Sequence, residues 1–140
     1  MDAKQASVIL SETFEVLYQD QDRFAQSVYD LFFAGAPDAK ILFAHTNWEQ
    51  QRKMLMGALM LMVKNLDNPS LFKLTMTNLA ERHTRYGVKV QHFPPFSQAV
   101  LQSVQNQLGS KWREEVKESW HFAFRQIEQL MSDKIAHCQS

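Results

Sequence analysis

The stretch FKLTMTNLAERHTRYG, residues 72–87, decides how the fold is interpreted. Four residues within it recur at helical spacing, namely Phe72, Met76, Leu79 and His83. Steps of four, three and four residues place side chains on one face of an α-helix. Gly87 follows as a typical C-terminal stop. The segment is therefore predicted to be an amphipathic helix whose apolar face ends in one imidazole.

Helical periodicity continues on both sides of this stretch. Apolar stripes and sparse Gly and Pro punctuation predict further helices over residues 10–17, 24–32, 47–66, 94–109 and 110–131. No window of useful length shows the alternation of a half-buried strand. We therefore expect an all-α fold, with residues 1–140 forming one domain.

Composition narrows the class of protein. The 140 residues are 45% hydrophobic and 21% charged, as in an ordinary globular chain. Fifteen basic side chains balance fifteen acidic ones, so no net positive charge favours binding to nucleic acid. The single cysteine, Cys138, excludes an internal disulfide framework and a multi-cysteine metal site. Neither a signal peptide nor a membrane span is predicted, and we expect a cytoplasmic protein without nucleic-acid or membrane partners.

His83 has two possible roles. A lone histidine on an apolar helical face is more often a hydrogen-bonded core residue than a metal ligand. However, Arg82, Arg85 and Lys89 place positive charge around this imidazole. Such surroundings suit a large, flat, apolar ligand with anionic edges. Haem is a ligand of this kind, and one neutral imidazole nitrogen is a sufficient protein ligand for its iron.

Candidate polar groups for the opposite side of such a ring lie earlier in the chain. Gln50 and Met54 are four residues apart and are expected on one helix face. Tyr29 lies in the helix predicted at 24–32. A Tyr hydroxyl and a Gln amide both donate hydrogen bonds, so they are expected to hold a polar diatomic ligand. Alternatively, Tyr29 is a core residue whose hydroxyl bonds a backbone carbonyl.

The order of these parts resembles the bacterial single-domain globins related to the haem domain of flavohaemoglobins. The matching residues are ERHTRYGV at 81–88, His92-Phe93-Pro94, Leu42-Phe43, Tyr29, Gln50 with Arg52-Lys53, and Trp120. The resemblance covers essentially the whole chain. It implies a globin fold of six to eight helices enclosing haem b, with the iron bound by His83.

The same resemblance implies the remaining site residues. The side chains expected to enclose the cofactor are Phe43, Lys53, Met54, Leu79, Arg82, Val88, Phe93 and Phe96. Among them, Phe43 occupies the position of the aromatic residue that wedges the ring. Tyr29 and Gln50 correspond to the residues that hold oxygen, nitric oxide or carbon monoxide.

Two departures from the flavohaemoglobin pattern concern the environment of His83. Phe93 stands where the family has a Tyr that polarises the histidine, and Ile135 stands where it has a Glu, with Asp133 nearby. We therefore expect His83 to donate its second N–H to a backbone carbonyl and to act as a neutral ligand of ordinary basicity.

The expected function is binding and storage of oxygen and other diatomic gases, together with nitric-oxide dioxygenation. Because the chain contains no Gly-rich phosphate-binding loop, the electrons are expected to come from a separate reductase. Two alternatives remain open. One is a gas sensor that acts through a partner, and the other is a haem-free helical interaction module.

Overall fold

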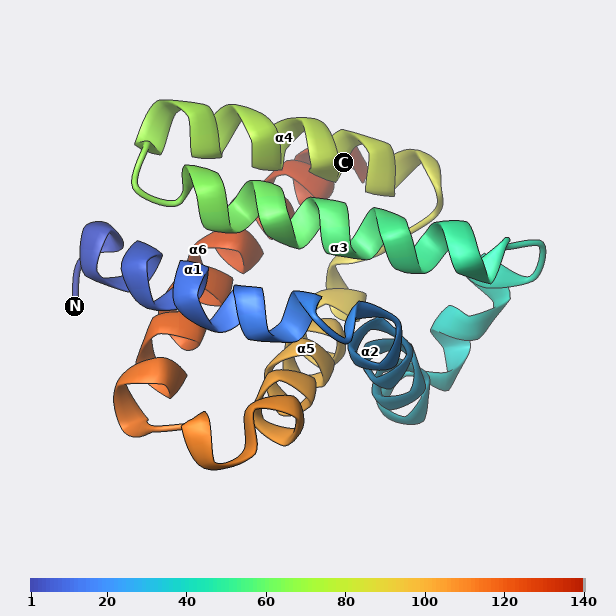
Figure 1. Ribbon diagram of the computed structural model, residues 1–140. Helices are drawn as coiled ribbons and strands as arrows, with labels where there is room; N and C mark the ends of the chain where they lie inside the picture. The colour runs from blue at the N-terminus through green and yellow to red at the C-terminus, as the bar shows by residue number, and fades with distance from the viewer. Residues whose placement is uncertain (140) are drawn as a thin grey trace.

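The computed structural model describes the backbone of residues 1–139 and the side chains of residues 1–131 and 133. This part of the chain contains helices and no strands, which confirms the all-α prediction (Figure 1). The helices are α1 (Ala3–Tyr18), α2 (Gln21–Gly35), η1 (Pro37–Phe43), α3 (Trp48–Asn65), α4 (Pro69–Arg85), η2 (Val90–His92), α5 (Phe93–Leu108), η3 (Gly109–Lys111) and α6 (Glu114–Gln139). The side chains of Ile135 and Cys138 lie outside the described residues.

Local chemistry sets where several helices begin. The Asn47 side chain accepts a hydrogen bond from the Gln50 backbone N–H at 3.1 Å and so caps the start of α3. Asn68 caps α4 in the same way, with Pro69 in the first turn. The last helix begins at Glu114, later than the sequence predicts, because residues 109–111 form the 3-10 helix η3 instead.

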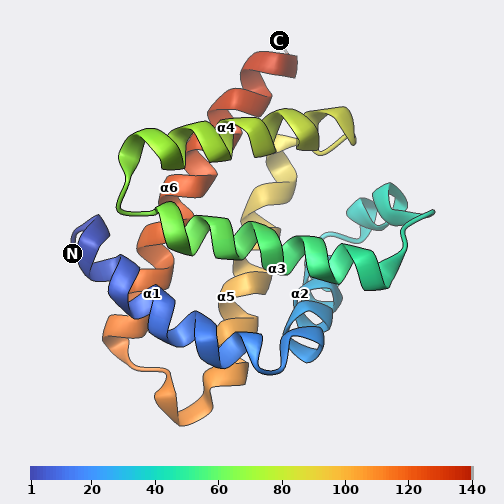
Figure 2. The same cartoon turned by 45° about the horizontal axis from the view of Figure 1, so that its top comes forward.

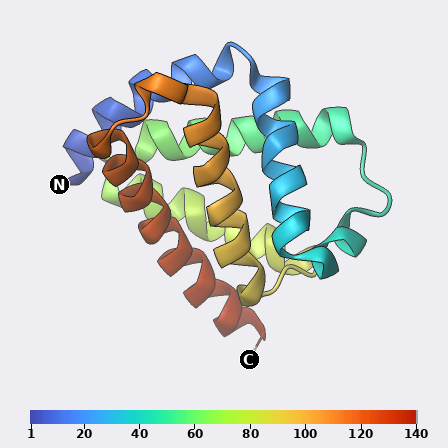
Figure 3. The same ribbon diagram turned by 90° about the horizontal axis from the view of Figure 1, so that it is seen from below.

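The helices are arranged in two crossing layers. Figure 3 shows α2, α5 and α6 side by side, with α3 and α4 crossing behind them. Figure 2 shows α3 and α4 as neighbours along this second layer. The fully buried Trp120 of α6 donates from Nε1 to Thr13 Oγ1 of α1 at 2.9 Å, which joins the two ends of the chain. In the described part of the chain, no helix is both long and apolar enough to cross a membrane.

The apolar core divides into a large and a small cluster. The small cluster contains Ala80, Phe93 and Met131, from three different helices. Leu79 and Ile127 pack against both clusters. This division lies near the C-terminal end of α4, the part of the helix that carries His83.

Candidate functional site

His83 occupies the last turns of α4, and its ring is half-buried. Its Nδ1 lies 2.7 Å from the carbonyl oxygen of Leu79, one helical turn earlier, and donates a hydrogen bond to it. This contact confirms the expectation that His83 donates its second N–H to a backbone carbonyl. The other ring nitrogen, Nε2, makes no hydrogen bond with any described residue, so its lone pair is available to a metal.

The protonation of His83 suits this role. Burial of the ring lowers the pKa of His83, because it disfavours the charged imidazolium. The hydrogen bond to the Leu79 carbonyl opposes this effect, and the positive charge of Arg82 adds to it. At neutral pH the imidazole is therefore uncharged, which is the form that coordinates a metal ion.

Apolar residues of the small core cluster flank this histidine along the chain. Leu79 and Val88 pack with Phe93, whose side chain is 6% exposed and offers no hydrogen-bonding group. Asp133 is exposed and accepts a hydrogen bond from Gln129 Nε2 at 3.3 Å. Neither Phe93 nor Asp133 therefore polarises the imidazole, which agrees with a ligand of ordinary basicity.

Tyr29 and Gln51 form the second polar group. The Tyr29 side chain is 3% exposed, and its hydroxyl oxygen accepts a hydrogen bond from Gln51 Nε2 at 2.8 Å. Burial raises the pKa of Tyr29, and the Gln51 hydrogen bond only partly offsets this rise. The phenol therefore keeps its proton at neutral pH and still has that proton to donate.

The structure corrects the predicted register of α3 by one residue. Gln50, which was expected to hold the ligand together with Tyr29, is exposed, while the neighbouring Gln51 is the glutamine that hydrogen-bonds Tyr29. In the same way, Met54 is 51% exposed, whereas Leu55 is 7% exposed and belongs to the core.

The cause of this error is that α3 carries two neighbouring stripes at helical spacing. The inner stripe consists of Gln51, Leu55, Leu59 and Met62. The outer stripe consists of Gln50, Met54, Ala58 and Leu61. Both begin with a glutamine and continue with apolar residues, so periodicity alone does not separate them. The larger summed volume of the inner stripe is the signal that identifies it.

Two aromatic rings pack against the ring of Tyr29 and against each other. Trp48 meets it edge-on at a centroid distance of 5.1 Å, and Phe43 does so at 5.6 Å. Trp48 and Phe43 are themselves stacked, with centroids 5.6 Å apart and an interplanar angle of 20°. Trp48 was not among the predicted site residues. Trp48 is the first residue of α3, and no apolar stripe in the sequence identified it as a site residue.

The other expected site residues differ in exposure. Phe96 is partly buried, and its ring lies 5.3 Å from that of Phe32. Arg82 and Lys53 are exposed, and Lys53 forms an ion pair with Glu49 at 3.7 Å. The contribution of these residues to cofactor binding remains a prediction.

The donor set fits a cofactor that brings most of its own metal ligands. Among the described residues, no group of three or more His, Cys, Asp or Glu side chains could hold a metal ion. His83 offers one neutral nitrogen within apolar surroundings, and Tyr29 offers one buried phenol. A single protein nitrogen is sufficient when a porphyrin supplies the other four, so these residues fit haem.

The architecture is that of an all-helical protein that carries one uncharged, half-buried imidazole and one buried phenol. Residues 26–131 match the Globin family, and the chain belongs to that family. The family assignment and the all-α fold agree with the globin resemblance of the sequence.

Relatives and solved structures extend this result. A "Flavohemoprotein" of Xylella fastidiosa is 26% identical over 130 residues, covering 91% of this chain and 32% of the relative. The chain thus spans about a third of the length of that relative. An uncharacterized globin-like protein of Aquifex aeolicus is 27% identical, with 83% and 81% coverage.

Among solved structures, an engineered carbene transferase derived from a putative nitric oxide dioxygenase of Rhodothermus marinus has a TM-score of 0.83 at 22% identity. The alignment covers 99% of this chain and 96% of that structure. A bacterial globin of Campylobacter jejuni has a TM-score of 0.81 at 21% identity, with 97% and 98% coverage. At these identities, the likeness shows the shared fold.

Proposed function

We propose that the protein binds haem b through Nε2 of His83 and receives oxygen, nitric oxide or carbon monoxide on the side of Tyr29. The observation that carries this proposal is the geometry of His83, whose half-buried ring is anchored through Nδ1 to the Leu79 carbonyl and makes no hydrogen bond through Nε2 with any described residue. When bound, the haem iron supplies reversible binding of diatomic gases and the electron exchange needed for their conversion.

Tyr29 and Gln51 provide the polar contacts for the ligand. Because Gln51 donates to the phenol oxygen, the proton of Tyr29 is directed to a different acceptor. A donor that is itself hydrogen-bonded is polarised and becomes a stronger donor. The burial of Tyr29 keeps water from competing for its proton. These contacts favour slow release of oxygen, which serves storage or consumption of the gas better than rapid delivery.

Nitric-oxide dioxygenation is the reaction that we favour for the bound oxygen. It combines oxygen with nitric oxide to give nitrate, and each turnover requires one electron from a reductase. Support comes from the flavohemoproteins among the relatives and from the putative nitric oxide dioxygenase among the structural neighbours. We propose a separate reductase and a cytoplasmic location as parts of the same function.

An absorption spectrum tests the cofactor part of this proposal. Protein expressed with adequate haem is expected to show a Soret band, and its ferrous form is expected to bind carbon monoxide. Rapid mixing of the oxygenated protein with nitric oxide then tests the reaction, with nitrate as the expected product. Absence of a Soret band would remove the gas-binding function and leave a helical interaction module. Haem binding without nitrate formation would leave oxygen storage or gas sensing through a partner.

A further inference from the structure

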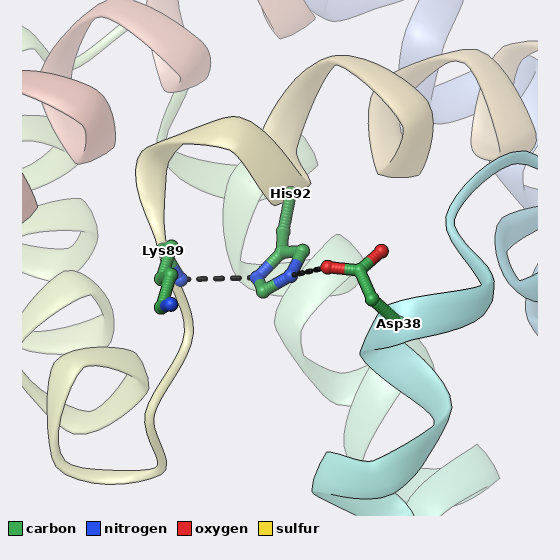
Figure 4. Close-up of polar contacts among 3 residues, drawn as sticks. All are labelled: Asp38, Lys89 and His92. Carbon is green, nitrogen blue, oxygen red and sulfur yellow. Dashed lines mark hydrogen bonds and ion pairs between the residues drawn. The ribbon is translucent and has the colours of Figure 1, made fainter.

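His92 bridges two segments of the chain that are far apart in sequence. His92 is 6% exposed, and each of its ring nitrogens has a partner (Figure 4). Nδ1 accepts from the Lys89 backbone N–H at 3.0 Å, and Nε2 lies 3.1 Å from Asp38 Oδ2. A neutral imidazole has one N–H, and the Lys89 contact requires Nδ1 to be the acceptor. The proton is therefore on Nε2, which donates to Asp38.

The Asp38 carboxylate is ionised in this pair. The hydrogen bond from His92 lowers the pKa of Asp38 below its ordinary value. The contact is therefore a charge-assisted hydrogen bond, which is shorter and stronger than a neutral one. The Asp38 side chain is also 63% exposed and lines an open groove of about 710 Å³, so water weakens the attraction. The pair therefore contributes more to the positions of its two segments than to overall stability.

The two segments have few other links to each other. The helix η1, which carries Asp38, packs mainly on α2, whereas η2 packs on α5 and α6. A second close approach lies between Gly87 and Leu42, where a Cβ on the glycine would lie 3.4 Å from the leucine Cδ2. With a φ of 88°, Gly87 adopts a backbone conformation that other residues rarely adopt. The segment 86–92 is thus held against η1 at two points.

Both segments lead directly to proposed cofactor contacts. Phe43 ends η1, five residues after Asp38. Phe93 follows His92 and packs in the cluster that includes Leu79, whose carbonyl anchors His83. Phe93 and Leu79 thus form a continuous series of neighbours between His92 and the imidazole of His83.

We propose that His92 and Asp38 are positioning residues of the haem site, an inference that rests on the proposed function. Their hydrogen bond holds the segment after α4 against η1. It thereby keeps a fixed separation between the two proposed cofactor contacts, Phe43 and Phe93. It thereby sets how long the cofactor is retained and how uniformly His83 is oriented.

The test uses the haem-loaded protein and three variants. Asp38→Ala removes the acceptor, Asp38→Asn keeps an acceptor oxygen without the charge, and His92→Phe keeps a ring without the hydrogen bonds. Haem transfer to an acceptor apoglobin is expected to become about threefold to tenfold faster in Asp38→Ala and His92→Phe. Asp38→Asn is expected to fall between these and the wild type. A fourth variant, Asp38→Ala combined with His92→Phe, is expected to resemble His92→Phe alone, because that substitution already breaks the contact with Asp38.

A second measurement separates positioning from a general loss of stability. The iron–histidine stretching band of the ferrous, ligand-free protein is expected to broaden in Asp38→Ala and to recover in Asp38→Asn. Exchange of the Lys89 amide proton is expected to accelerate in His92→Phe, because its acceptor is removed. The matched control is Asp20→Ala, which removes an exposed carboxylate from a 3.9 Å ion pair with Arg23 and is expected to change neither measurement.

The outcomes distinguish the two proposals. Wild-type protein without a Soret band would overturn the proposed function, and the inferred role of His92 would fail with it. Haem-loaded variants with wild-type transfer rates and an unchanged stretching band would overturn the positioning role alone. Equal acceleration in Asp20→Ala would also overturn it, because the effect would then follow the loss of any surface carboxylate.

Discussion

The two sides of the proposed haem site are built in different ways. On the side of His83, the anchoring hydrogen bond stays within one helix and joins residues four apart. On the side of Tyr29, the corresponding hydrogen bond joins α2 to α3 across 22 residues. The first arrangement follows from helix geometry, whereas the second depends on how α3 is rotated about its axis. The first side is therefore expected to retain the cofactor, and the second to set the affinity for the gas.

The largest expected effect tests the retaining side. His83→Ala removes the proposed protein ligand of the iron, so haem retention is expected to weaken at least about a hundredfold. The native ferrous–carbon monoxide spectrum is expected to disappear. His45→Ala is the control, because His45 is exposed. A native spectrum in His83→Ala together with loss of haem in His45→Ala would contradict the assignment.

The next effect concerns the gas-binding side. Tyr29→Phe removes the phenol proton while the ring contacts with Phe43 and Trp48 are kept. Oxygen dissociation measured by stopped flow is expected to become about tenfold to a hundredfold faster, the range for a hydrogen bond to a charged group. Haem retention is expected to stay unchanged. Identical oxygen dissociation in the variant and the wild type would show that Tyr29 has no role in holding the ligand.

A smaller effect resolves the register of α3. Gln51→Leu removes the donor to Tyr29, and oxygen dissociation is expected to become about threefold to tenfold faster. Gln50→Leu is the matched control on the adjacent, exposed position and is expected to leave the rate unchanged. If Gln50→Leu had the larger effect, the register predicted from the sequence would apply in solution instead.

The smallest effect is the pH dependence of the cofactor-free protein. Burial lowers the pKa of His83, so the unfolded chain takes up a proton near pH 6.5 that the folded chain binds only at lower pH. The free energy of unfolding should therefore decrease as the pH falls below about 6.5 and level off below the folded-state pKa. His83→Phe should remove this part of the decrease in denaturant titrations. An unchanged pH profile in that variant would argue against a buried, neutral His83.

The His83 side depends on contacts within one helix, whereas the Tyr29 side depends on contacts between helices. This difference explains which features the sequence could predict. The helix of His83, its backbone hydrogen bond and the apolar Phe93 depend on neighbours within a few turns, and these predictions agree with the structure. The pairing of Gln51 with Tyr29 was missed because the rotation of α3 depends on other helices.

The missed contacts include the partners of His92. The sequence marked His92 only as part of the His92-Phe93-Pro94 match, whereas the structure buries its ring and gives it a long-range partner. Its partner Asp38 lies 54 residues away, and no periodicity connects positions so distant. Such contacts become visible only once the chain is folded.

The two stripes of α3 also affect the energy landscape of folding. Turning the helix by one residue, about 100°, would replace the inner stripe with the outer one. Such a turn would keep a glutamine near Tyr29 and a mainly apolar face on the core. The turn would lose volume, since Ala58 would take the place of Leu59, and it would bury a polar group, since Asn65 would take the place of the buried Leu66. Frustration at this helix is therefore resolved by shape and polarity together, and substitutions at positions 58 and 59 would shift the balance between two packings.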